Sequence, residues 1–334
     1  MSEVNWRLGH LDHLESPWGN AGGVVKKIED VERMARTGVG WIEVGSYTLE
    51  ERYGNDKNPE TGEFIIDEET GEPIRVYYHN PQSGETYNSL GMPNNGMDKV
   101  EKEIPEMVRI AHAAKIPKKL LVNVAPVTDE PVSEVKELVQ RAYQAGADGV
   151  ILNGGCPNVI TDNGGRHEIL STNPRAFRQV LIGLRPVVQK FEPVYVRLSP
   201  LDTYDKTKTM LRVVEDSKTV STTFMPNSFN GQIPHIDGKK VLGVKGDTAG
   251  KTGPATANQT YKQAKWAKDI LNGSGIDVVR SGGIADWEEG EVSAVGELRR
   301  TVALGALGAG TTFYYEAGES WEEATQKLLE KLAA

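Results

Sequence analysis

The feature that most constrains the fold is a regular alternation of short apolar runs with amphipathic helical patterns along all 334 residues. Apolar runs bounded by turn formers indicate buried strands, and apolar residues spaced three or four apart indicate helices. The predicted strands are 18–21, 41–44, 120–124, 150–152, 194–198, 221–225, 277–280 and 308–313. The predicted helices are 28–37, 100–114, 132–145, 175–190, 206–216, 257–271, 292–304 and 321–332. About eight strand–helix units predict an α/β chain folded as one (β/α)8 TIM barrel domain over 1–334, with a doubly wound open sheet as the alternative.

Two polar, turn-rich segments interrupt this alternation, at about 55–87 and 230–256. The first contains β-like patches at 63–66 and 74–78, and the second resembles a hairpin around Asp237-Gly238. We expect both to be hairpin insertions at one mouth of the barrel. Such insertions serve as lids or binding walls in some proteins and as surface decoration in others, so both interpretations stay open.

Composition and charge exclude several classes of protein. The net charge of −9 argues against binding to nucleic acid or to an anionic membrane surface. One cysteine excludes an intramolecular disulfide, and no apolar run approaches the roughly 18 residues that span a bilayer. The N-terminus also lacks a hydrophobic signal core. We therefore expect a soluble, cytoplasmic protein, and the sequence offers no metal site.

The single cysteine lies in the most informative loop of the chain. Cys156 stands in Asn-Gly-Gly-Cys-Pro-Asn at 153–158, directly after a predicted strand. In a (β/α)8 barrel, the C-terminal ends of the strands carry the chemistry. A lone cysteine is more often a small buried hydrophobic residue. This loop is a poor place for a core residue, however, and the flanking amides of Asn153 and Asn158 suit a polar ring.

Polar side chains stand at other predicted strand ends as well. They include Asn20, Ser46, Asn123, Arg197, Asn227 and Ser228. Each asparagine alone is most often a turn or cap residue, but together they favour a site for a planar heterocycle rich in carbonyl and N–H groups. Arg197 either supplies a fixed positive charge that favours a reduced flavin or forms a salt bridge of the barrel.

A phosphate signature follows the seventh predicted strand. Gly282 and Gly283 stand in Ser-Gly-Gly-Ile at 281–284. Glycines let backbone N–H groups approach an anion, and a following helix N-terminus adds its dipole. Barrels often hold a phosphate group after strands seven and eight. The sequence thus predicts a phosphorylated ligand at this edge.

These stretches, in this order, resemble the dihydroorotate dehydrogenase family, above all its soluble, class 1 members. The matching segments are 20–23, 48–55, 88–96, 153–158, 196–200, 227–228, 250–254 and 281–284. The resemblance implies an FMN-dependent (β/α)8 barrel that oxidises dihydroorotate, in pyrimidine biosynthesis, or a related small cyclic substrate.

The resemblance also implies residue roles. Cys156 matches the base that removes a proton from C5 of dihydroorotate, while a hydride passes from C6 to flavin N5. The residues implied to hold the substrate are Asn88, Asn153, Asn158, Asn227 and Ser228. The residues expected on the flavin side are Ala21, Gly22, Ser46, Asn123, Arg197, Gly253, Gly282, Gly283, Thr311 and Thr312. Residues 159–172 are expected to form a lid.

The chain departs from the family pattern at charged positions. Gly45 stands where the soluble class carries a lysine, so Lys26 or Lys27 is a possible replacement. Arg197 replaces the usual flavin-side lysine, and a guanidinium keeps the charge but cannot lose it. The resemblance therefore supports FMN as the cofactor more directly than it supports dihydroorotate as the substrate.

The partners follow from the resemblance too. We expect a soluble electron acceptor, either fumarate or NAD through a partner subunit, and a homodimer. Two alternatives stay open: a flavin-free, phosphate-binding barrel that acts as a lyase or isomerase, and a non-catalytic descendant of the enzyme.

Overall fold

A closed barrel of eight parallel strands forms the centre of the molecule. The computed structural model describes residues 6–158, 169–318 and 320–334. The strands run in the order β10-β15-β16-β3-β4-β7-β8-β9 around the barrel. Their bounds are β3 (Trp18–Asn20), β4 (Trp41–Tyr47), β7 (Lys119–Val124), β8 (Gly149–Asn153), β9 (Val194–Arg197), β10 (Val220–Met225), β15 (Asp277–Ser281) and β16 (Leu307–Gly310). The predicted (β/α)8 barrel is confirmed, and the open sheet is excluded.

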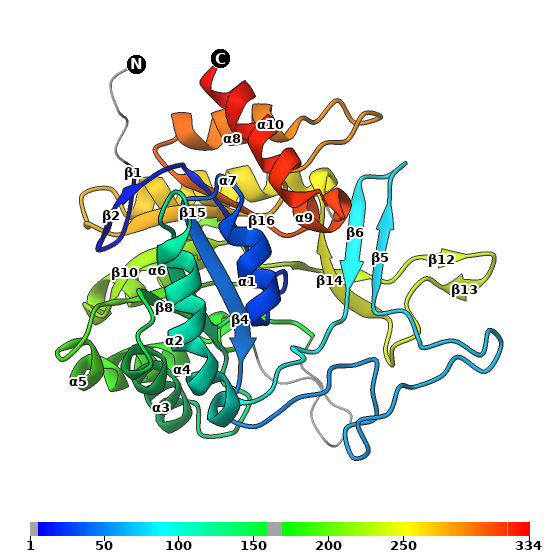
Figure 1. Cartoon of the computed structure of the whole chain (residues 1–334), viewed down its shortest axis with the longest axis horizontal. Helices are drawn as coiled ribbons and strands as arrows, with labels where there is room; N and C mark the ends of the chain where they lie inside the picture. The colour runs from blue at the N-terminus through cyan, green and yellow to red at the C-terminus, as the bar shows by residue number, and fades with distance from the viewer. Residues whose placement is uncertain (1–5, 159–168, 319) are drawn as a thin grey trace.

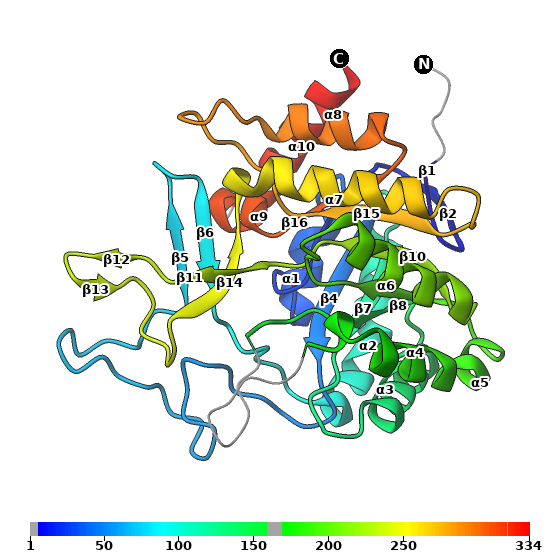
Figure 2. The same ribbon diagram turned by 180° about the vertical axis from the view of Figure 1, so that it is seen from behind.

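Helices surround the barrel (Figures 1 and 2). They are α1 (Ile28–Ala35), α2 (Met97–Ala113), α3 (Pro131–Gln144), α4 (Pro174–Gly183), α5 (Arg185–Val188), α6 (Tyr204–Ser217), α7 (Ala257–Ile270), α8 (Ala294–Ala303), α9 (Thr312–Ala317) and α10 (Trp321–Ala333). The side chains of Asn173, Thr203 and Ser293 accept backbone N–H groups in the first turns of α4, α6 and α8, which fixes where these helices begin. The single helix predicted over 175–190 divides into α4 and α5, because Pro186 cannot continue a hydrogen-bonded turn.

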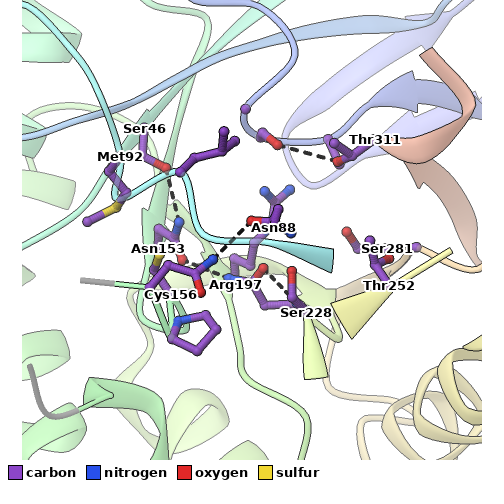
Figure 3. A pocket seen from close by; sticks show the side chains of 18 of the residues that line it. Ser46, Asn88, Met92, Asn153, Cys156, Arg197, Ser228, Thr252, Ser281 and Thr311 are labelled. Carbon is purple, nitrogen blue, oxygen red and sulfur yellow. Dashed lines mark hydrogen bonds between the residues drawn. The ribbon is translucent and has the colours of Figure 1, made fainter. Parts of the chain in front are cut away.

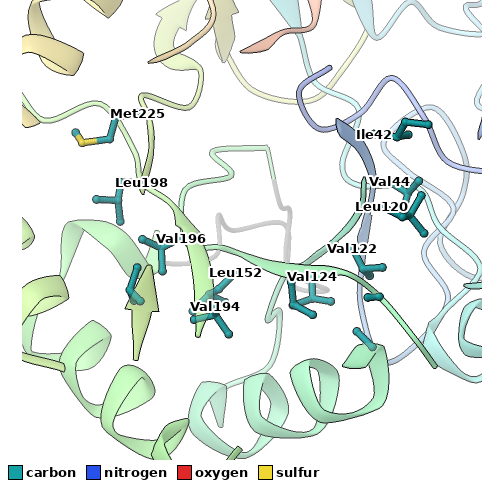
Figure 4. Close-up of a cluster of buried hydrophobic side chains, with 14 of the residues drawn as sticks. Ile42, Val44, Leu120, Val122, Val124, Leu152, Val194, Val196, Leu198 and Met225 are labelled. Atoms are coloured by element: carbon teal, nitrogen blue, oxygen red, sulfur yellow. The ribbon is translucent and has the colours of Figure 1, made fainter. Parts of the chain in front are cut away.

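Side-chain alternation along the strands separates two cores. Ile42, Val44 and their equivalents on neighbouring strands point outward and pack against the helices (Figure 4). Trp41, Tyr195 and Phe224 point inward and fill the barrel. The hairpin of β1 (Trp6–Leu8) and β2 (Leu11–Leu14) packs leucines against this inner core, and Leu8 accepts a hydrogen bond of 3.0 Å from the hydroxyl of Tyr195. Apolar residues thus fill the N-terminal end of the barrel, and the inner face becomes polar toward the C-terminal ends.

The eighth strand ends earlier than predicted. Residues 311–313 favour strand by composition, but β16 stops at Gly310 and Thr312 begins α9. Tertiary packing overrides the local preference here. Phe313 and Tyr314 stack around Trp18, whose Nε1 donates to the Tyr314 hydroxyl at 2.8 Å.

The two insertions meet in a second sheet beside the barrel mouth (Figure 2). Its antiparallel strands are β11 (Phe229–Gln232), β14 (Thr248–Thr252), β6 (Glu85–Asn88) and β5 (Tyr77–Asn80), in that order. The turn at Asp237-Gly238 joins β12 (His235–Ile236) to β13 (Lys239–Lys240), as predicted. At the β-like patch 63–66, isolated antiparallel bridges join Lys57 to Phe64 and Ile66 to Pro73. These turns do not extend into a sheet, and Phe64 and Ile66 are half exposed.

Candidate active site

A cavity lies at the C-terminal mouth of the barrel, where the ends of seven barrel strands and the insertion sheet converge (Figure 3). The predicted site residues that line it are Ala21, Gly22, Lys26, Ser46, Asn88, Asn153, Cys156, Asn158, Arg197, Asn227, Ser228, Gly282, Thr311 and Thr312. Lys27, Asn123, Gly253 and Gly283 lie outside this lining. Residues 159–168 of the expected lid fall outside the described part of the chain.

The thiol and a half-buried lysine share this cavity. Cys156, on the loop after β8, is half-buried beside Met92, Ala125 and Val127. Lys26, between β3 and α1, donates from Nζ to the carbonyl of Pro93 at 3.1 Å. Burial lowers the pKa of Lys26 to about 8, and the negative charge of a Cys156 thiolate acts in the opposite direction. The two groups are therefore close enough to interact electrostatically.

The neighbouring lysine has a different position. Lys27 is exposed at the start of α1. Of the two lysines considered from the sequence, the structure thus brings Lys26 alone to the cavity.

The asparagine amides form two hydrogen-bonded chains, drawn in Figure 3. In the first, Asn227 Nδ2 donates to Asn153 Oδ1 at 3.2 Å, and Asn153 Nδ2 donates to Ser46 Oγ at 3.0 Å. In the second, Asn158 Nδ2 donates to Asn88 Oδ1 at 2.9 Å. An amide can make up to four hydrogen bonds, so each side chain is held in one orientation and keeps capacity for a ligand.

The positive charge at the barrel floor is paired. Arg197, the last residue of β9, donates from Nη1 and Nη2 to both carboxylate oxygens of Glu43 at 2.7 and 2.6 Å. Asn123 Nδ2 donates to the same carboxylate at 2.6 Å. Asn123 therefore lies one layer below the cavity, as a partner of Glu43. The salt-bridge interpretation of Arg197 is correct, and its side chain still lines the cavity.

Hydroxyl groups line the end of the cavity away from Cys156, near the ends of β15 and β16 (Figure 3). They belong to Thr252, Ser281, Thr311 and Thr312. The Thr312 hydroxyl is buried and has no hydrogen-bond partner among the described residues. Gly282 and Gly283 both have positive φ. A side chain at Gly283 would come within 2.5 Å of the Thr260 hydroxyl, so this turn requires glycine.

A family model described as dihydroorotate dehydrogenase matches residues 9–332. The chain belongs to the dihydroorotate dehydrogenase family. Curated relatives include a dihydroorotate dehydrogenase (quinone) of Sodalis glossinidius, 24% identical over 79% of this chain and 73% of that protein. Another is the catalytic subunit of a dihydroorotate dehydrogenase B (NAD(+)) of Thermoanaerobacter, 27% identical over 60% of each chain. The fold matches that of DHODH from Eimeria tenella in its complex with ferulenol, with a TM-score of 0.73 at 17% identity, covering 99% of this chain and 83% of the other.

Dihydroorotate dehydrogenases are flavoproteins that oxidise a CH–CH bond, so family membership identifies the chain as an oxidoreductase of this type. It excludes the lyase and isomerase alternative. The names of the two relatives specify different electron acceptors, quinone and NAD(+). In the described part of the chain, no helix is long and apolar enough to cross a membrane. Within that same part, no cluster of three or more His, Cys, Asp or Glu residues could hold a metal ion.

Several residues that line the cavity could not be predicted from the sequence. Tyr77 and Thr86 reach the cavity from the insertion sheet, and Tyr315 reaches it from α9. The rings of Tyr77 and Tyr315 lie 4.7 Å apart between centroids. Glu43 was missed because it sits inside an apolar run, Trp41–Val44, which reads as a uniformly buried strand.

Proposed function

We propose that this chain binds FMN and oxidises dihydroorotate, with Cys156 as the base. One observation carries the proposal: the only thiol of the chain and a half-buried lysine line the same cavity as four asparagine side chains. A core cysteine would need none of these polar neighbours.

The cavity residues suit FMN at both of its ends. A phosphate group needs hydrogen-bond donors, and the hydroxyls of Ser281, Thr311 and Thr312 supply them beside a glycine turn. The buried Thr312 hydroxyl has no partner among the described residues, so it is available to a ligand oxygen. At the other end, Arg197 offers a cation to the flavin ring, and bound FMN supplies the acceptor for the hydride from C6.

The substrate is held by amides and by one ammonium group. Asn88, Asn153, Asn158 and Asn227 offer donors and acceptors that complement a ring with carbonyl and N–H groups. Lys26 offers a positive charge to the carboxylate of dihydroorotate. The hydrogen bonds among the amides orient them before the substrate arrives, which reduces the entropic cost of binding.

Cys156 removes the proton from C5. A cysteine thiol has an ordinary pKa of about 8.5, so only a small fraction is ionised at neutral pH. The positive charge of Lys26 lines the same cavity, and the two groups interact electrostatically. The apolar contacts with Met92, Ala125 and Val127 limit the access of water to the sulfur.

The electron acceptor and the assembly remain parts of the same proposal. We favour a soluble acceptor, fumarate or NAD through a partner subunit, and a homodimer. Steady-state assays with fumarate, with NAD and with a quinone analogue distinguish the acceptors, and light scattering of the purified protein gives the oligomeric state.

Anaerobic mixing tests the central claim. Purified protein should be yellow, and dihydroorotate should bleach its visible absorbance. The Cys156→Ala variant should keep FMN bound but reduce it at least about 100-fold more slowly, the lower end of the range for loss of a general base. Cys156→Ser serves as the matched control, since serine keeps a weaker hydroxyl base in the same space. Protein that does not bind FMN, or a Cys156→Ala variant that is bleached at the wild-type rate, contradicts the proposal.

A further inference from the structure

A buried ion pair forms the floor of the cavity. Glu43 is fully buried, and the side chain of Arg197 is 4% exposed. Two parallel hydrogen bonds join them end to end, and Asn123 adds a third to the carboxylate. The backbone of Glu43 is fixed too: Asn20 accepts its N–H at 2.8 Å and donates to its carbonyl at 2.6 Å. Four strands of the barrel therefore hold one carboxylate in place.

The guanidinium has little freedom to move. Phe224 lies under it, with the Arg197 Cζ atom 5.2 Å from the ring centroid. Gly22 lies beside it, since a side chain there would come within 2.7 Å of Nη1. The Nε donor of Arg197 is buried and has no hydrogen-bond partner among the described residues, although the side chain lines the cavity. A buried donor without a partner calls for an acceptor, and a ligand in the cavity that this side chain lines is one candidate.

We propose that Glu43 is a positioning residue that orients Arg197 and cancels its charge, so that the flavin meets a directed hydrogen-bond donor in a neutral pair. This inference rests on the proposed function, because it requires FMN in this cavity. A lone cation at a flavin ring favours the reduced form, which carries more negative charge. A paired cation with its carboxylate 2.6 Å away exerts a much weaker field at the same place. The pair thus keeps the reduction potential lower than an unpaired arginine would.

The redox potential of the bound flavin tests this idea. The Glu43→Gln variant keeps the shape of the side chain but removes its charge, which leaves Arg197 as an unpaired cation. The ratio of reduced to oxidised FMN at a fixed potential should rise at least about tenfold, a shift of about 30 mV for a two-electron couple. The double variant Glu43→Gln/Arg197→Met removes both charges, and its ratio should stay within about threefold of wild type.

A second buried pair provides the control. Arg280 and Glu297 form an ion pair on the outer face of the barrel, at 2.7 Å. The Glu297→Gln variant also removes a buried carboxylate charge, but its potential should match that of wild type.

Each outcome decides between the alternatives. An unchanged reduction potential in Glu43→Gln overturns the inference. A tenfold fall in the ratio of reduced to oxidised FMN in the double variant also overturns it, because such a fall would mean that Arg197 acts as an unpaired cation in the wild type. Thermal unfolding of the apoproteins checks that each variant folds. Should Glu43→Gln not fold, the double variant decides alone, because it buries no unpaired charge. Wild-type protein that binds no FMN overturns the proposed function and the inference together, whereas bound FMN with an unchanged potential overturns the inference only.

Discussion

Removing Arg197 alone should destabilise the barrel severely, even without FMN. The Arg197→Met variant deletes two of the three side-chain hydrogen bonds to the Glu43 carboxylate and leaves the single bond from Asn123. Glu43 is fully buried, so water cannot replace the lost partners. Breaking one side of such a pair costs about 3–5 kcal/mol of the free energy of unfolding, because the remaining charge stays buried.

The double variant Glu43→Gln/Arg197→Met should lose much less, about 0–2 kcal/mol, since replacing both partners leaves no unpaired charge. The pair therefore predicts strong non-additivity, because the double variant should lose less stability than Arg197→Met alone. Urea unfolding of the apoproteins, followed by circular dichroism at pH 8, measures these values.

The surface pair of Arg141 with Glu101 provides the matched control. Arg141 bonds three carboxylates at the surface, and its Nε lies 2.7 Å from Glu101. Solvent-exposed pairs contribute about 0–1 kcal/mol each, so Arg141→Met should cost far less than Arg197→Met. A loss below about 1 kcal/mol in Arg197→Met, or strictly additive single variants, would refute the argument that the inner carboxylate depends on Arg197.

Three further predictions follow from the site. Orotate, the product of dihydroorotate oxidation, should bind about tenfold more weakly per pH unit above pH 8, because Lys26 loses its proton there. Calorimetric titration measures this affinity. The Lys26→Met variant should show no such pH dependence, whereas the control variant Lys27→Met should keep it. Partial burial, with Asp286 nearby, raises the pKa of Glu316 to about 7. The folded state therefore binds a proton more tightly than the unfolded state, and the free energy of unfolding should fall as pH rises from 4.5 to 7. Urea unfolding of Glu316→Gln should lack this fall. Gly22→Ala should cost about 1–3 kcal/mol in the same assay, because its methyl group would overlap Arg197, and an unchanged stability would show that the pair can move.

The barrel and its mouth could be predicted because both depend on local pattern. Buried strands such as Gly149–Asn153 are apolar runs bounded by turns, and amphipathic helices separate them. Parallel strands bring their C-terminal ends together, so polar residues at those ends converge whatever the details of the sheet. That reasoning correctly predicted that Asn153, Cys156, Arg197 and Asn227, from three separate stretches of sequence, would lie in one cavity.

Contacts between distant segments could not be predicted in this way. Asn88 donates to Gly250 across 162 residues, and no local pattern pairs the two insertions into one sheet. Thr312 begins a helix although its surroundings favour strand, because aromatic packing around Trp18 decides the conformation. Glu43 looked like an ordinary member of a buried strand, and its partner lies 154 residues away.

Arg197 illustrates why two interpretations that exclude each other in sequence can coexist in structure. A guanidinium has five N–H donors arranged in a plane. Glu43 occupies one donor on each terminal nitrogen, which leaves Nε and the outer hydrogens for a ligand. A lysine ammonium could not span both carboxylate oxygens in the same fork, and it would also bring a more strongly hydrated charge to the barrel floor. Arg197 and Glu43 therefore function as a pair. The carboxylate supplies the negative charge that a buried cation requires, and the planar guanidinium has donors both for this carboxylate and for a ligand in the cavity.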